Sequence, residues 1–124
     1  MSTLTISNLN DGTTTVPTTY ITNGSAKSWI NYKGTSTNAI MESLNMSSVT
    51  DNGTGDYTMT FSNAMATAEY SITDGTYRSS GSNSPGITGF ESPTANNYIH
   101  NHWNSGISVS DMFRTYSQVN GDLA

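Results

Sequence analysis

The chain has 124 residues, a formal net charge of −5 and only four basic residues. Nucleic-acid binding depends on Lys and Arg that neutralise phosphates, so this charge balance argues against a nucleic-acid partner. The sequence has no apolar run long enough to span a membrane, no leader pattern at its start and no cysteine. We therefore expect no membrane partner, no disulfide or thiolate chemistry, and synthesis in a cytoplasm.

Uncharged polar residues dominate the composition, with 19 serines, 20 threonines and 14 asparagines, whereas hydrophobic residues make up 33%. Abundant threonine with little lysine or glutamate disfavours helices and suits a hydroxyl-covered sheet. The 7 tyrosines, 2 tryptophans and 3 phenylalanines can form a core, although a thin one. A thin core in a β protein with open sheet edges predicts that neighbouring chains complete the burial.

The first 20 residues predict an extended N-terminal arm, which precedes a β domain over residues 21–124. Leu4, Ile6 and Leu9 are the apolar residues of this arm. They suffice for an anchoring strand but not for an independent fold. We expect the arm to dock on a neighbouring protein by adding a strand to an exposed sheet edge.

The first clear strand is predicted over Ala26–Tyr32. Its period of two places Ile30 and Tyr32 on one face, and Trp29 and Asn31 on the other. An exposed tryptophan beside an amide is typical of a surface that binds sugars, whereas a core or subunit-interface tryptophan is the commoner arrangement. The sequence leaves both interpretations of Trp29 open.

A β-hairpin is predicted between a strand around Ile40–Val49 and a strand over Tyr57–Phe61. The turn predicted between them is Asn52-Gly53, because Asn and Gly tolerate the positive φ angles of a tight turn. On this prediction, valine at position 53 would strain the backbone more than valine at Gly55.

The remaining strands are short and separated by Gly, Asn and Ser. The chain predicts strands over 69–74, 87–91, 98–103 and 107–116, a return pairing at 76–78, one helical turn at 64–67 and a loop over 79–86. Such spacing is typical of an antiparallel β-sandwich or open barrel, so the predicted fold class is all-β.

The two histidines, His100 and His102, are the strongest local signal for chemistry. On a strand, positions i and i+2 project from the same face, so both imidazoles could reach one metal, and a trimer would bring three such pairs together. The other interpretation is a pair of structural histidines beside Trp103. We find no nucleophile elbow, phosphate-binding loop or zinc-protease motif, and we predict no catalytic residue and no cofactor.

Two segments resemble a module of tailed-bacteriophage virions, of the kind found in marine and cyanobacterial phages. These are Asn23–Thr35, with Ala-Lys-Ser-Trp-Ile-Asn-Tyr at its centre, and Ser43–Phe61, with Thr-Asp-Asn-Gly-Thr-Gly-Asp-Tyr-Thr. The resemblance covers about residues 3–75. Such modules close with a further apolar strand after a Gly-Asp turn, which is not recognisable at Gly121–Ala124.

The resemblance implies a non-enzymatic virion protein located on the particle. The leading hypothesis is an accessory surface protein, either capsid decoration or a short fibre. It would oligomerise, as a homotrimer, and contact the major capsid protein or a tail component. The alternative is a tail-fibre tip module that binds a receptor or host surface glycan. The short length favours the first hypothesis.

Overall fold

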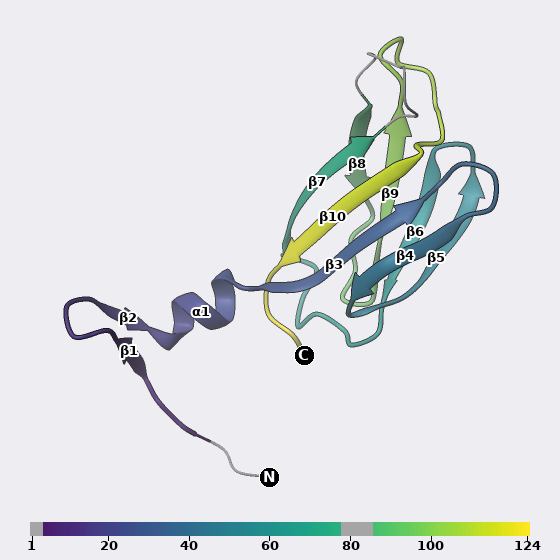
Figure 1. Ribbon diagram of the computed structural model, residues 1–124. Coiled ribbons are helices and arrows are strands. Elements are labelled where there is room, and N and C mark those ends of the chain that lie inside the picture. Colours follow the sequence, from purple (N-terminus) through teal and green to yellow (C-terminus); the bar gives the residue numbers. More distant parts are fainter. Residues whose placement is uncertain (1–3, 78–85) are drawn as a thin grey trace.

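The computed structural model describes residues 4–77 and 86–124, so most of the loop predicted over 79–86 lies outside the described residues. The described chain is mostly β, as predicted. Its two four-stranded antiparallel sheets pack face to face as a sandwich that does not close into a barrel (Figure 1). The elements are β1 (Asn8–Asn10), β2 (Thr15–Pro17), α1 (Thr18–Gly24), β3 (Ala26–Lys33), β4 (Ala39–Leu44), β5 (Met46–Gly53), β6 (Asp56–Phe61), β7 (Ser71–Tyr77), β8 (Ile87–Glu91), β9 (Asn97–Trp103) and β10 (Arg114–Asn120).

The first sheet has the strand order β4-β3-β10-β7 and the second has the order β5-β6-β9-β8. The chain passes between the sheets at Asn45, which has a φ of 55° and separates β4 from β5. The sequence predicts one strand here, around Ile40–Val49. The structure corrects this to two strands in different sheets, because Asn tolerates the left-handed region that the crossing needs. Ile40 and Leu44 consequently remain exposed.

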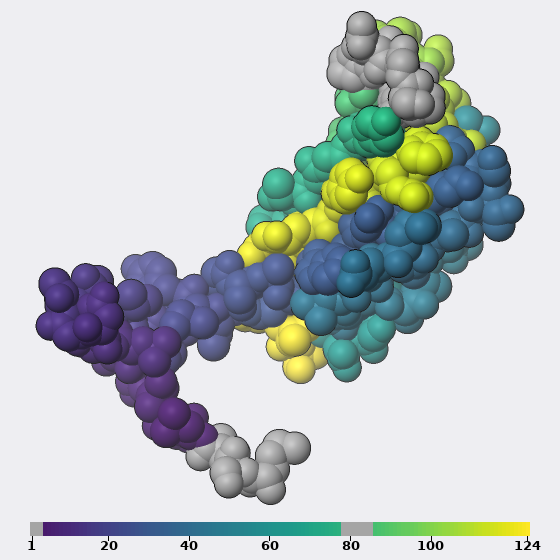
Figure 2. All heavy atoms as spheres, in the orientation of Figure 1, coloured from purple at the N-terminus to yellow at the C-terminus, as the bar shows by residue number. Residues whose placement is uncertain are grey.

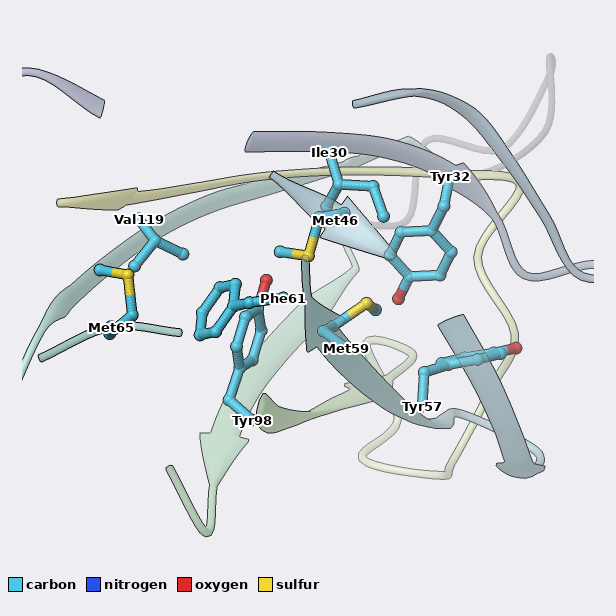
Figure 3. Packing of buried hydrophobic residues seen from close by; sticks show 9 residues of the cluster. All are labelled: Ile30, Tyr32, Met46, Tyr57, Met59, Phe61, Met65, Tyr98 and Val119. Carbon is cyan, nitrogen blue, oxygen red and sulfur yellow. The ribbon is translucent and has the colours of Figure 1, made fainter. Parts of the chain in front are cut away.

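The core lies between the sheets and consists mainly of aromatic and methionine side chains. Ile30 and Tyr32 point inward from β3, as predicted, and meet side chains of the second sheet (Figure 3). Tyrosine supplies much of the volume of this core, which compensates for the low content of aliphatic residues. The buried cluster comprises Ile30, Tyr32, Met46, Tyr57, Met59, Phe61, Met65, Tyr98 and Val119.

Hydrogen bonds between the sheets accompany this packing. The Tyr98 hydroxyl lies 3.0 Å from Oγ of Ser117, and the Tyr57 hydroxyl lies 3.0 Å from the Gly34 carbonyl oxygen. A buried tyrosine needs such a partner, because an unpaired hydroxyl in the interior costs about 1–3 kcal/mol. The interior therefore depends on specific polar contacts as well as on apolar burial.

The predicted hairpin is present, formed by β5 and β6, but the position of its turn differs from the prediction. Gly53 pairs with Asp56, so the turn residues are Thr54 and Gly55, and a bulge interrupts the ladder between Asp51 and Gly53. A Cβ on Gly55, whose φ is 70°, would lie 2.6 Å from the His102 carbonyl oxygen, whereas one on Gly53 would meet no atom within 4 Å. The prediction that position 53 is the more constrained is therefore wrong.

The last strand, β10, also lies later in the chain than predicted. The sequence predicts a strand over 107–116, whereas β10 begins at Arg114 and lies between β3 and β7. The expected return pairing at 76–78 is wrong as well, because β7 runs without interruption through Tyr77. In the first sheet β10 thus joins β3 to β7. Residues 64–66 form backbone hydrogen bonds with the segment that follows β10.

Residues 4–24, here called the N-terminal segment, lie outside the sandwich as a separate projection (Figures 1 and 2). The described part of the predicted extended arm forms a small hairpin, β1–β2, and the start of α1. A helical turn was predicted at 64–67, but Met65 there pairs with Leu123 in an isolated β-bridge, and α1 is the helix of the described chain. Pro17, with φ of −57°, precedes α1, where a residue without an N–H loses nothing.

Candidate functional site

The outer face of the first sheet carries the site that we consider strongest for binding. Strand alternation turns Trp29 and Asn31 of β3 outward, together with Tyr116 and Gln118 of β10. Asn31 pairs with Tyr116 across the two strands, and Trp29 pairs with Gln118. In Figure 2 the atoms of β10 (yellow) lie on this face between those of β7 (teal) and β3 (blue).

This face is hollow at Gly75, which carries no side chain. Tyr116 pairs on its other side with Gly75 of β7, and a Cβ at Gly75 would meet no atom within 4 Å. The result is an open depression of about 450 Å³, bordered by the rings of Trp29 and Tyr116 and by Glu42 of β4. This volume falls within the range of about 300–1,000 Å³ typical of small-ligand sites. We call it the Gly75 depression.

The chemistry of the Gly75 depression is polar, aromatic and acidic. Its lining includes the carboxylate of Glu42 and the strand residue Asp74, whose own carboxylate points inward to His100. Among the described residues the lining holds no lysine or arginine. The Tyr116 side chain is 47% exposed, so its ring is available to a ligand. Oδ1 of Asn31 is buried, and within the described part of the chain it has no hydrogen-bond partner. An unpaired amide oxygen beside a depression can accept a hydrogen bond from a ligand hydroxyl.

Sequence analysis identified part of this site. Trp29 and Asn31 share the outer face as predicted, and Trp29 is half-buried rather than a core residue. Gly75 and Tyr116 were missed, because their contribution depends on the placement of β10. The other predicted interaction residues, Leu4, Ile6 and Leu9, belong to the N-terminal segment and do not line the depression.

The predicted histidine pair lies in the interior. His100 and His102 both project from β9 between the sheets, with their side chains fully buried and their ring centroids 4.6 Å apart. Nε2 of His100 lies 3.1 Å from Oδ2 of Asp74, and Nε2 of His102 lies 3.0 Å from the Tyr32 hydroxyl. Phe90 stacks on the His100 ring at 4.7 Å.

Burial determines the protonation of these groups. It lowers the pKa of His102 to about 3, and it lowers the pKa of His100 more than the Asp74 carboxylate raises it. Burial would raise the pKa of Asp74, but hydrogen bonds from His100 and Thr88 bring that pKa below its ordinary value. A neutral imidazole therefore donates its Nε2 hydrogen to an ionised carboxylate.

This arrangement suits structural histidines better than a metal site. Both rings face the interior, so they cannot line an axis between three copies of the chain. Across residues 4–77 and 86–124, no group of three or more His, Cys, Asp or Glu side chains is placed to hold a metal ion. The imidazoles also lack a solvent path on which a substrate could reach them, since both are fully buried.

A second surface feature is the apolar character of the N-terminal segment. None of its described residues is fully buried, and Leu4 is 82% exposed and Tyr20 72% exposed. A hairpin with three-residue strands and a seven-residue helix is too small to be stable on its own. Its exposed large apolar side chains are Leu4, Ile6, Leu9, Val16, Tyr20 and Ile21.

The described chain contains no helix that is long and apolar enough to cross a membrane. Comparison of the chain with protein-family models, with curated proteins and with solved structures finds no match.

Proposed function

We propose that this protein is an accessory structural protein of a bacteriophage virion, a capsid decoration protein or short fibre, that acts by assembly and not by catalysis. The observation that carries the proposal is the N-terminal segment. It projects from the sandwich and exposes six large apolar side chains. Contiguous exposed apolar surface on a small domain is characteristic of an interaction site.

The resembling motifs support the same proposal. They fall on β3, on the end of β4 and on the β5–β6 hairpin, where Ile30, Tyr57 and Phe61 enter the core. The motifs thus encode the sandwich, whereas the N-terminal segment supplies the surface for partners. The partners we propose are further copies of this chain, as a homotrimer, and a capsid or tail protein of the particle.

An edge-pairing mode of docking is consistent with the fold. The outer strands of the sheets are β4, β5, β7 and β8, and each has one side that no strand within residues 4–77 and 86–124 covers. An extended segment of a neighbour can pair with such an edge through backbone hydrogen bonds. The N-terminal segment of one copy reaches away from its own sandwich, which places it for contact with the next copy.

The first experiment measures the mass of the purified full chain by light scattering. We expect an oligomer, and we expect the triple variant Leu4→Ser, Ile6→Ser and Leu9→Ser to be a monomer with unchanged circular dichroism. The control carries Ile107→Ser and Val109→Ser, which replace exposed apolar residues outside the segment. A parent chain that is monomeric at all concentrations would contradict self-assembly.

The second experiment tests the virion location. Antibodies against the purified protein should label the surface of particles of the phage that encodes it, as seen by immunogold electron microscopy. Absence of the protein from purified particles by mass spectrometry would refute the virion role, whatever the oligomeric state.

A further inference from the structure

We propose that the Gly75 depression binds a neutral saccharide. The proposal does not depend on the assembly role, because it concerns the face of the first sheet and not the N-terminal segment. It unites four features of that face: two aromatic rings, a hollow at Gly75, side chains able to bond hydroxyl groups, and a lining without basic side chains among the described residues.

The rings provide the stacking surface. Asn31 pairs directly with Tyr116, so Trp29, two residues before Asn31, is the diagonal neighbour of Tyr116. Diagonal neighbours on one face of a sheet have separations of about 7–8 Å, within reach of large side chains. The apolar face of a sugar ring can therefore pack against Tyr116 while Trp29 covers its edge. Amphipathic aromatic residues suit a ligand with both apolar and hydroxyl surfaces.

Gly75 provides the space. Its outward position beside Tyr116 holds no side chain, so one flank of the tyrosine ring is uncovered. Glycine in a strand interior weakens the strand and often marks close approach of a ligand. Gly75 does not have a positive φ and its Cβ would clash with no described atom, so neither backbone geometry nor packing among the described residues requires glycine here.

The polar side chains determine the class of ligand. The polar side chains in the lining include Asn31, Gln118 and Glu42. The two amides donate and accept hydrogen bonds and the carboxylate accepts them, which matches vicinal hydroxyls that both donate and accept. Oδ1 of Asn31 has no hydrogen-bond partner within the described residues and can accept a hydrogen bond. An anionic sugar or phosphate would meet the Glu42 carboxylate without a compensating cation among the described lining residues, so a neutral ligand is favoured.

Isothermal titration calorimetry and amide chemical-shift mapping on the full chain test the proposal. The probes are maltohexaose, cellohexaose and mannohexaose as neutral saccharides, and sialyllactose as an anionic one. We expect at least one neutral probe to bind at millimolar concentration and to shift amides near Trp29 and Tyr116. Sialyllactose should bind at least tenfold more weakly.

The decisive variant is Gly75→Thr. Threonine has a higher strand propensity than glycine and its Cβ has room, so the fold should be retained or stabilised. Its side chain would occupy the hollow, and we expect affinity to fall at least tenfold. Tyr116→Ala should lower affinity by a similar factor. Tyr20→Ala, which removes an exposed tyrosine on the N-terminal segment, is the control and should bind like the parent.

Three results would overturn the proposal. One is failure of all three neutral probes to bind the folded parent. Another is binding that Gly75→Thr leaves unchanged, which would place the ligand elsewhere. The third is a self-association that Tyr116→Ala abolishes while no saccharide competes with it, which would assign this face to a second copy of the chain.

Discussion

Nε2 of His100 lies 3.1 Å from Oδ2 of Asp74 and thereby links β9 of the second sheet to β7 of the first. The histidine side chain is fully buried and the aspartate side chain is 16% exposed. Such a pair connects the two layers through a neutral imidazole and an ionised carboxylate. Burial disfavours the protonated form of this imidazole, so the sandwich should be sensitive to acid.

The first prediction is that stability falls on acidification from pH 7. The pKa values of His100 and His102 are lowered in the fold, His102 to about 3, while an unfolded histidine titrates near 6.5. Below about pH 6.5 the unfolded chain therefore binds protons that the folded chain does not. His102 should remove about 1.4 kcal/mol per pH unit from the free energy of unfolding, and His100 acts in the same direction.

Asp74 extends this dependence to lower pH with the same sign. Its folded pKa lies below the unfolded value of 3.8, so the stability it contributes is present above 3.8 and is lost as pH falls through the folded pKa. Urea unfolding at several pH values between 7 and 4 measures the slope. A free energy of unfolding that stays constant over this range would contradict neutral burial of the histidines.

The second prediction concerns the Tyr57 hydroxyl. It donates to Oδ1 of Asp111 at 2.6 Å, and the Gly34 carbonyl lies within 3.0 Å. Tyr57→Phe leaves both acceptors without this donor, and we expect a loss of about 1–3 kcal/mol in the free energy of unfolding. Tyr20→Phe, at an exposed tyrosine, should change it by less than about 0.5 kcal/mol. Equal denaturation midpoints for the two variants would show that the buried hydroxyl contributes nothing.

The third prediction compares two glycines of one turn. Gly55→Ala combines a φ of 70° with a Cβ 2.6 Å from the His102 carbonyl oxygen, whereas Gly53→Ala strains the backbone in open space. Crowding of this kind costs about 1–3 kcal/mol beyond the backbone strain. Thermal melts should therefore show the larger loss for Gly55→Ala. The reverse order would mean that Asn52-Gly53 is the turn after all.

The fourth prediction concerns Asn45, where the chain crosses between sheets. Its Oδ1 accepts a hydrogen bond from the backbone N–H of Asn63 at 2.7 Å, and its φ is 55°. Asn45→Ala loses the hydrogen bond and keeps the strain, whereas Asn45→Gly loses only the hydrogen bond. We expect alanine to be the more destabilising by about 1 kcal/mol. Chemical denaturation of both variants measures the difference, and a more stable alanine variant would contradict the argument.

Alternation of apolar residues predicted the strands whose inward residues are apolar. β3 and β6 were placed correctly, because Ile30 and Tyr32 in one and Met59 and Phe61 in the other repeat at period two. The same pattern predicted the fold class and placed Trp29 and Asn31, which line one side of the Gly75 depression, on one face of their strand.

Alternation failed where the inward residues are polar. β10 turns Thr115 and Ser117 inward, where Ser117 meets the Tyr98 hydroxyl and Thr115 lies 3.3 Å from Nε2 of His102. The partners of these side chains lie in another sheet, and a local pattern contains no information about them. Because the position of β10 was not predicted, its pairing of Tyr116 with Gly75 could not be predicted, and neither could the depression.

The position of β10 has a consequence for how the protein folds during synthesis. Both β3 and β7 obtain a neighbour from β10, which follows all other described strands along the chain. The first sheet cannot be completed until β10 has left the ribosome. The pairing of β10 with β3 joins residues that lie far apart in the sequence. Before then, β7 has no partner in its sheet and the apolar faces of β3 and β6 are incompletely covered. We expect ribosome-bound chains that stop before Arg114 to be protease-sensitive and to aggregate readily.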